Sequence, residues 1–159
     1  MTTKKLGIIA TKGTLDGAYP PLILASTGAA LGYEVQVYFT FYGLQILRKH
    51  VNLKVTPLGN PAMPMPIGMD KWLPVLATTL PGMEALMSMM MKRTMRTKGV
   101  ASVEGLRGLC LEADVKMIAC TMAMDLFGIQ KGELISGIEF GGATTFFEFA
   151  GETDICLFM

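Results

Sequence analysis

Short, strongly apolar runs alternate with helix-like segments along the chain, and this alternation limits the folds that are open to it. The clearest runs are residues 5–11 (KLGIIAT), 34–40 (EVQVYFT) and 115–120 (VKMIAC). Strands that are apolar throughout are typical of parallel sheets whose two faces are covered by helices. The pattern predicts a three-layer α/β domain, doubly wound and flavodoxin-like, with about five mainly parallel strands.

The remaining elements follow from local signals. A helix is expected over residues 20–31, because two prolines suit a first turn and Gly32 suits a helix end. Weaker strands are expected at residues 53–58 and 133–140, and a terminal strand at residues 153–159 (TDICLFM). Further helices are expected at residues 41–50, 82–99, 102–113, 121–128 and 141–152.

A Pro/Met-rich excursion at about residues 59–98 stands apart within what we expect to be a single domain of residues 1–159. Loops of this length inside a compact domain are usually functional or cover an interface. The second half carries an apolar stripe at helical spacing, which favours a helix packed on the core. A flexible Met-rich binding surface and capture of a soft metal by thioethers are the alternatives. The stripe comprises Met83, Leu86, Met87, Met90 and Met91.

The same segment is apolar enough to be considered as a membrane-spanning or membrane-contacting region. Its longest charge-free stretch, residues 72–83, is interrupted by Pro74 and Pro81. It is also shorter than the roughly 20 residues that span a bilayer. We therefore do not expect a membrane span, and keep peripheral membrane contact as an option.

Low charge is the main constraint from composition. The chain is 51% hydrophobic and 17% charged, whereas soluble domains usually carry about a quarter charged residues. We expect much of the surface to be covered by other subunits of a homo-oligomer. The net charge of +1 and the absence of a basic stripe interleaved with aromatics argue against nucleic acid as a partner. Three cysteines and an N-terminus without a signal-peptide pattern favour a reducing cytoplasm.

The three cysteines fall in different settings. Cys110 lies on the apolar face of a predicted helix and is expected to be a small core residue. Cys120 ends a strand and precedes a helix, whose first-turn N–H groups and dipole favour a thiolate. A buried structural role is the alternative for Cys120. Cys156, in the terminal strand, is either buried or able to approach Cys120 or a partner chain.

Residues that directly follow the strands supply the other site candidates. In parallel α/β folds, ligands gather outside the carboxyl ends of the strands. Thr11 and Lys12 follow the first run, Tyr42 follows the second and Thr121 follows Cys120. We therefore predict that these four residues bind substrate around the Cys120 sulfur.

Several other kinds of site are disfavoured. There is no C-x-x-C pair and His50 is the only histidine, so we expect neither a metal site nor a Cys/His hydrolase. The glycine-containing segments match neither a phosphate loop nor a dinucleotide fingerprint, and we expect no cofactor.

Residues 120–129 form a C-x-M-x-M-D-x-x-G-I motif. This motif most specifically, together with residues 5–44, 99–129 and 153–159, resembles the DsrE/DsrF-like family, and the resemblance covers nearly the whole chain. It is strongest to a single-chain branch of sulfurtransferases, often found beside rhodanese and TusA-like proteins and sometimes labelled peroxiredoxin-like. The resemblance implies a flavodoxin-like homo-oligomer in which a cysteine carries sulfur as a persulfide and passes it to another thiol.

Within the resemblance, two cysteines match family positions. Cys120 matches the cysteine of the motif and Cys156 matches the cysteine of the C-terminal strand, whereas Cys110 matches neither. We expect Cys120 to attack a donor persulfide, with the helix N-terminus and Lys12 stabilising the anionic sulfur. Cys156 is then a second carrier, or resolves Cys120 into a disulfide. An oligomeric adaptor without chemistry and a thiol peroxidase are the competing functions.

Overall fold

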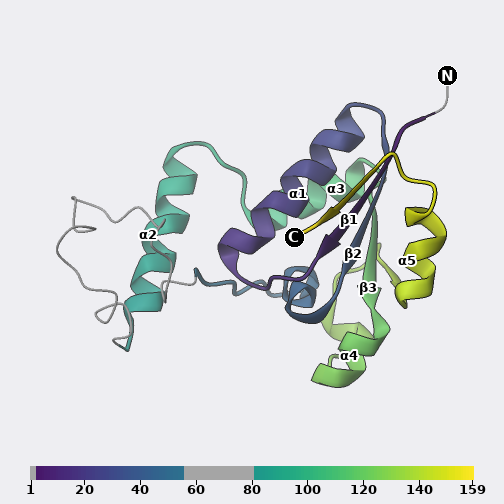
Figure 1. The fold of residues 1–159 in the computed structure, drawn as a ribbon. Coiled ribbons are helices and arrows are strands. Elements are labelled where there is room, and N and C mark those ends of the chain that lie inside the picture. The colour runs from purple at the N-terminus through teal and green to yellow at the C-terminus, as the bar shows by residue number, and fades with distance from the viewer. Residues whose placement is uncertain (1–2, 56–80) are drawn as a thin grey trace.

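Five parallel strands form a single sheet at the centre of the molecule. The computed structural model describes residues 3–55 and 81–159, and the sheet has the order β4-β3-β2-β1-β5 (Figure 1). This confirms the predicted α/β class and its five-stranded parallel sheet. The strands are β1 Lys5–Ala10, β2 Glu34–Phe39, β3 Lys116–Cys120, β4 Glu139–Gly141 and β5 Ile155–Phe158.

Helices cover both faces of this sheet. Helices α1 and α3 pack on each other over one face, α5 lies over the other, and α2 stands apart beside α1 (Figure 1). Short 3-10 helices, η1 and η4, complete the described elements. No helix among the described residues is both long and apolar enough to cross a bilayer. The bounds are α1 Leu15–Ala30, η1 Phe41–Leu47, α2 Met83–Thr97, α3 Val103–Glu112, α4 Thr121–Phe127, η4 Lys131–Glu133 and α5 Ala143–Ala150.

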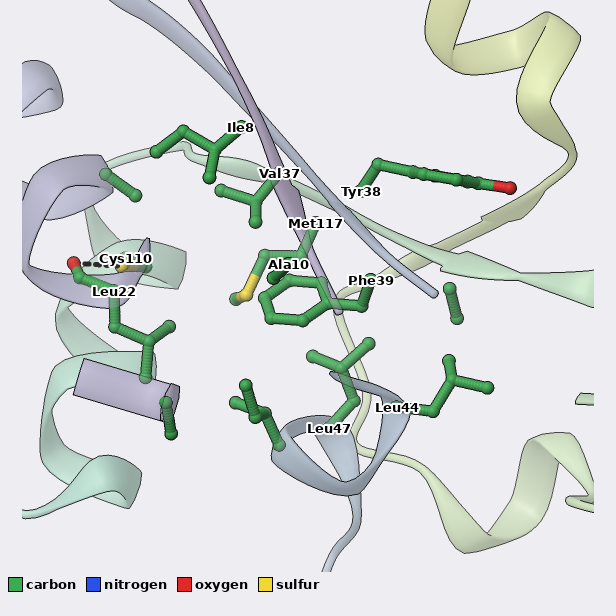
Figure 2. Close-up of a cluster of buried hydrophobic side chains, with 14 of the residues drawn as sticks. Ile8, Ala10, Leu22, Val37, Tyr38, Phe39, Leu44, Leu47, Cys110 and Met117 are labelled. Carbon is green, nitrogen blue, oxygen red and sulfur yellow. Dashed lines mark hydrogen bonds between the residues drawn. The ribbon is translucent and has the colours of Figure 1, made fainter. Parts of the chain in front are cut away.

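Side chains of successive residues in a strand point to opposite faces of the sheet, so the core has two sides. Val37, Phe39 and Met117 point into a cluster beneath α1 and α3, whereas Tyr38 points the opposite way (Figure 2). The Tyr38 ring stacks on Phe146 of α5, with ring centroids 5.3 Å apart. Both sides are therefore filled, which explains why β1, β2 and β3 are apolar throughout rather than at every second residue.

Helix α1 begins at Leu15, so its predicted start at residue 20 is wrong. The side chain of Thr14 accepts a hydrogen bond from the backbone N–H of Gly17 at 3.2 Å and caps the helix there. Pro20 and Pro21 consequently lie inside the helix, where each removes one backbone donor. The N-cap, rather than the prolines, decides where α1 begins.

The predicted strand at residues 53–58 is also wrong where the structure describes it. Residues 53–55 are not in a strand, and residues 56–58 lie outside the described residues. The backbone N–H of Val55 donates to the Ser88 hydroxyl of α2 at 2.9 Å, so it does not extend the sheet. The predicted excursion is described only from residue 81, and its second half forms α2 with Met87 buried and Leu86 exposed.

Helix α3 buries Val103, Leu106 and Cys110 against the core. Leu109 is 50% exposed although its spacing predicts the same face, and Arg107 is buried instead. The Arg107 guanidinium donates to the backbone oxygens of Ile46 and Arg48 at 2.7 and 2.9 Å. Arginine replaces an apolar residue on this face because it supplies donors to carbonyls at the end of η1.

Candidate functional site

Cys120 lies at the carboxyl edge of the sheet, where β3 ends and α4 begins. It pairs with Gly141 of β4, and continuing the register from Ala119 places Thr40 level with it on the other side. Cys120 is the N-cap residue of α4 and only 1% exposed. The structure therefore gives this thiol both burial and a helix N-terminus.

Four polar groups lower the pKa of the Cys120 thiol, in opposition to its burial. Burial on its own raises the pKa of the thiol, but hydrogen bonds from the Thr40 and Tyr38 hydroxyls oppose this effect. The backbone N–H groups of Ala123 and Met122 in the first turn of α4 add two more. Together the four donors outweigh burial, so the pKa of Cys120 lies below its ordinary value. A thiolate, the reactive form of cysteine, is thus stabilised inside the protein.

Tyr38 was not predicted as a site residue. Burial raises the pKa of Tyr38, and its hydrogen bond to Cys120 raises the pKa further, so the phenol keeps its proton and remains a donor. Tyr38 lies on β2 and Thr40 directly follows its last residue, so these two residues, two apart in extended backbone, share the face on which Cys120 lies. The spacing of these two residues in the sequence shows that they share a face. Only the register between β2 and β3, however, shows that this face lies beside Cys120.

A strained backbone follows Thr40. Phe41 has a φ of 49°, a left-handed conformation that is unusual for an aromatic residue. Gly43 lies so close to the backbone of Ala10 that a side chain at this position would clash. The turn after β2 is thereby held against the end of β1, which fixes the position of Thr40 beside Cys120.

Aromatic side chains gather on the surface next to Cys120. Phe41 and Tyr42 both contact Phe127 of α4, with ring centroids 6.4 and 5.4 Å apart. Tyr42 is 63% exposed, and Met122 and Leu126 of α4 are exposed as well. The predicted site residue Tyr42 therefore belongs to an exposed apolar surface that joins η1 to α4.

Three of the predicted substrate-binding residues line one hollow. Thr11, Lys12 and Tyr42 border an open depression of about 780 Å³ at the ends of β1 and β5. The Thr11 hydroxyl donates to the backbone oxygen of Met159 at 2.8 Å. Cys120 does not border this hollow, and the groups that act on its pKa are other residues. Thr121, the fourth predicted residue, is the first residue of α4 and directly follows Cys120.

Cys156 is not brought together with Cys120. It lies on β5, which is separated from β3 by β1 and β2, so three interstrand spacings of about 4.8 Å lie between them. The register also places Cys156 level with Lys116, the first residue of β3. A disulfide requires Cα atoms within about 7 Å, so these two cysteines of one chain cannot pair. Cys156 is exposed at the edge of the sheet.

Cys110 occupies the predicted position in the core between α3 and α1. It is fully buried, and its thiol donates to the backbone oxygen of Leu22 at 3.5 Å (Figure 2). Burial raises the pKa of Cys110 to about 11, against a smaller opposing effect of a backbone hydrogen bond from Ser26. Cys110 therefore stays protonated at neutral pH.

A metal site finds no support among the residues described. Within residues 3–55 and 81–159, no cluster of three or more His, Cys, Asp or Glu side chains could hold a metal ion. The arrangement around Cys120 supports thiol chemistry instead.

Comparison with known proteins gives a consistent picture. The DsrE/DsrF/DrsH-like family matches residues 2–158. The chain is 69% identical, over the full length of both chains, to a protein of Allochromatium vinosum named sulfur carrier protein DsrE2. It is 31% identical to the uncharacterized protein YrkE of Bacillus subtilis, covering 99% of this chain and 98% of that protein. The crystal structure of the YchN protein from E. coli shares the fold, with a TM-score of 0.57 at 12% identity over 99% of this chain and 100% of that one.

Proposed function

The chain belongs to the DsrE/DsrF/DrsH-like family, and from that premise we propose that it is a sulfur carrier which holds sulfane sulfur as a persulfide on Cys120. The sulfur-carrier role is that of a relative with 69% identity over the full length. The observation that supports Cys120 as the carrier is the set of four donors that lowers its pKa despite burial. Among the cysteines, Cys110 has a raised pKa and is enclosed in the core.

Loading begins with attack of the Cys120 thiolate on the outer sulfur of a donor persulfide. The new S–S bond joins Cys120 to that sulfur, and the bond within the donor breaks, so the donor leaves as a thiolate. The transferred sulfur retains its oxidation state, and neither oxidant nor reductant is needed. Tyr38 and Thr40 favour the thiolate form of the attacking sulfur, because their hydroxyls lower the pKa of Cys120.

Unloading is the reverse reaction and depends on the same hydrogen-bond donors. An acceptor thiolate attacks the outer sulfur of the Cys120 persulfide, and Cys120 leaves as a thiolate. Thiols of low pKa are better leaving groups in such exchange. The hydrogen bonds from Tyr38, Thr40 and the first turn of α4 stabilise the departing sulfur, so they favour transfer in both directions.

As a sulfur carrier, the protein exchanges sulfur with other sulfur-transfer proteins. We propose TusA-like and rhodanese-like proteins as these partners, and a homo-oligomer in the cytoplasm as the working form. Thr11, Lys12, Tyr42 and Thr121 remain the proposed contacts of the incoming sulfur group. The exposed surface of Tyr42 and Phe127 lies beside the buried thiol, which favours it as the contact surface for a partner.

Cys156 is proposed as a second, independent sulfur acceptor. Its exposure at the edge of the sheet allows a donor to approach. Its distance from Cys120 leaves the alternative role, resolution of Cys120 into a disulfide within one chain, without support. A peroxidase cycle that depends on such a disulfide is disfavoured for the same reason.

The experiment that tests the proposal is intact mass after incubation with a small persulfide donor, and separately with thiosulfate. Wild type, Cys110→Ser, Cys120→Ser and Cys156→Ser are compared. We expect a gain of one or more sulfur atoms that dithiothreitol reverses, with the sulfur on Cys120 lost in Cys120→Ser and retained in Cys110→Ser. Peptide mapping that finds Cys120→Ser as fully loaded as wild type would show that Cys120 is not the carrier.

A further inference from the structure

A cavity on the opposite side of the molecule from the Cys120 thiol is not used by sulfur transfer. It has a volume of about 300 Å³ and lies between α2, the start of α1 and the start of α3. Small-molecule sites begin at about this size. The cavity lies on the α1 and α3 side of the sheet, whereas alternation along β3 places Cys120 on the α5 side.

Specific contacts hold α2 in place and so keep the cavity open. The Ser88 hydroxyl accepts from the backbone N–H of Val55 at 2.9 Å and donates to the backbone oxygen of Glu84 at 2.7 Å. Met87 of α2 is buried in the hydrophobic core, and Met95 of the same helix is partly buried and packs against the core. Helix α2 is thus fixed to the body of the protein at its first half and leaves a space beside its second half.

Apolar side chains form part of the cavity lining, and Tyr19, Ser102 and charged side chains form the rest. Leu15, Leu53 and Val103 are almost fully buried at its base, and Val100 is a more exposed residue on its lining. Such a lining favours the aliphatic or aromatic part of a ligand over water. The apolar lining comprises Leu15, Val51, Leu53, Met95, Val100 and Val103.

Positive charge gathers where the cavity reaches the surface of α2. Lys92 and Arg96, one turn apart, line both this cavity and a second hollow of about 640 Å³. Lys54 and Arg93 line that second hollow. Like charges one turn apart on a helix repel each other, and the ion pairs found among the described residues do not involve Lys92, Arg93 or Arg96. An anion placed between the two hollows would relieve this repulsion.

Acidic groups near the cavity are fewer than the cations. Glu104 belongs to the wall formed by α3, and Glu84 lies 3.8 Å from Lys54 at the other end of α2. The excess of positive charge therefore lies along Lys92, Arg93 and Arg96. This arrangement favours a ligand whose negative charge is at one end and whose apolar part fills the cavity.

We propose that this cavity binds a small organic anion, with an aliphatic tail between α1, α2 and α3 and a carboxylate-like head against Lys92 and Arg96. The proposed ligand is a free molecule, and the vesicle experiment below distinguishes it from a lipid in a bilayer. The site does not depend on the chemistry of Cys120.

The test titrates the full chain with butanoate, hexanoate and octanoate, with octylammonium as the ligand of opposite charge, followed by amide chemical shifts. We expect saturable shifts at α2 and the start of α3, with affinity rising about fourfold for each added methylene until the cavity is full. Octylammonium is expected to bind at least tenfold more weakly than octanoate. Equal affinity for the two ligands, or shifts confined to the hollow beside Tyr42, would overturn the proposal.

Variants of the protein then show where the charged head and the aliphatic tail of the ligand bind. The exposed pair Lys92→Gln/Arg96→Gln is expected to lower octanoate affinity at least tenfold, while Lys4→Gln/Lys116→Gln, which removes the same charge elsewhere, leaves it unchanged. Val100→Trp is expected to fill the mouth of the cavity and abolish tail-length dependence. Equal binding by the Lys92/Arg96 variant and its control would overturn the proposal. So would adsorption to anionic phosphatidylglycerol vesicles without any binding of octanoate below its micelle concentration.

Discussion

Cys110 and Cys120 are equally buried thiols in one small protein, yet their environments have opposite effects on them. Cys110 lies between two helices and finds a carbonyl acceptor, the backbone oxygen of Leu22. Cys120 lies at the end of a strand and finds four donors. Burial raises the pKa of Cys110 to about 11, whereas the donors bring the pKa of Cys120 below its ordinary value.

The difference shows that exposure is a poor guide to thiol reactivity. An accepting neighbour favours the neutral S–H group, and donating neighbours favour the thiolate. The two ends of a secondary-structure element supply these groups unequally, because a helix N-terminus presents free N–H groups. Two of the groups that lower the pKa of Cys120 come from the start of α4 and two from Tyr38 and Thr40. Cys110 lies within α3, and only a backbone hydrogen bond from Ser26 opposes the effect of its burial.

The largest expected effect is on the rate of chemical modification. With methyl methanethiosulfonate at neutral pH, we expect native Cys110 to react roughly a hundredfold or more slowly than Cys120, because a thiol with a pKa of about 11 is rarely deprotonated at this pH, whereas the pKa of Cys120 lies below its ordinary value. Peptide mass spectrometry over a time course measures both rates in one sample. Similar rates for the two cysteines would contradict the opposite shifts of their pKa values.

The next effect concerns the two side-chain donors. Tyr38→Phe and Thr40→Val each remove one hydrogen bond to a charged sulfur, and such bonds are worth about 1.5–3 kcal/mol. We expect each variant to slow modification of Cys120 at neutral pH by about tenfold and to move the midpoint of its pH–rate profile upward. Tyr19→Phe is the matched control, since that hydroxyl bonds to the backbone oxygen of Ala101 instead. A profile unchanged in Tyr38→Phe would remove Tyr38 from the site.

The pH dependence of stability should separate the two thiols by sign. The raised pKa of Cys110 contributes stability that is complete below the unfolded thiol value of about 8.5 and is lost as pH rises through about 11. The pKa of Cys120 is lower in the folded state than in the unfolded state. Cys120 therefore contributes stability that is complete above the unfolded pKa of about 8.5, and this stability is lost as the pH falls through the folded pKa.

Urea denaturation across this range measures both contributions as differences from variants. The stability advantage of wild type over Cys110→Ala should shrink by about 2–3 kcal/mol from pH 8 to pH 11, while its advantage over Cys120→Ala should grow from acid to alkaline pH. Two difference curves of the same slope would contradict the assignment of opposite shifts.

The smallest expected effect comes from the strained backbone beside Cys120. Phe41→Gly and Phe41→Ala both remove the ring, but only glycine adopts a φ of 49° without cost. We expect the glycine variant to be more stable than the alanine variant by about 1 kcal/mol, by denaturant titration of the two. Greater stability of the alanine variant would show that the conformation of Phe41 is not strained.

Features that depend on a few consecutive residues could be predicted from the sequence. Strands β1, β2 and β3 were predicted within a residue or so, because each is apolar on both faces. The junction of Cys120 with α4 followed from one strand and the helix after it. The start of α1 was predicted wrongly because two prolines outweighed Thr14, the residue that caps the helix.

Features that depend on strand register could not be predicted in this way. Thr40 and Cys120 are 80 residues apart in the sequence and meet only because β2 and β3 pair in parallel with Phe39 opposite Ala119. The separation of Cys120 from Cys156 likewise follows from the order of the strands. Arg107 occupies an apolar-looking helix face because of carbonyl groups contributed by η1, which the pattern of α3 does not reveal.

The strand order also determines when the sheet is completed during synthesis. β1, the first strand made, lies between β2 and β5, and the contact of Lys5 with Asp154 closes a separation of 149 residues. Contacts so distant in sequence slow folding. The four strands from β1 to β4 can assemble, with Cys120 in place among its donors, while one edge of β1 stays unpaired. An exposed edge is open to pairing with another chain, so a folding chain in which β5 has not yet paired with β1 is prone to aggregate.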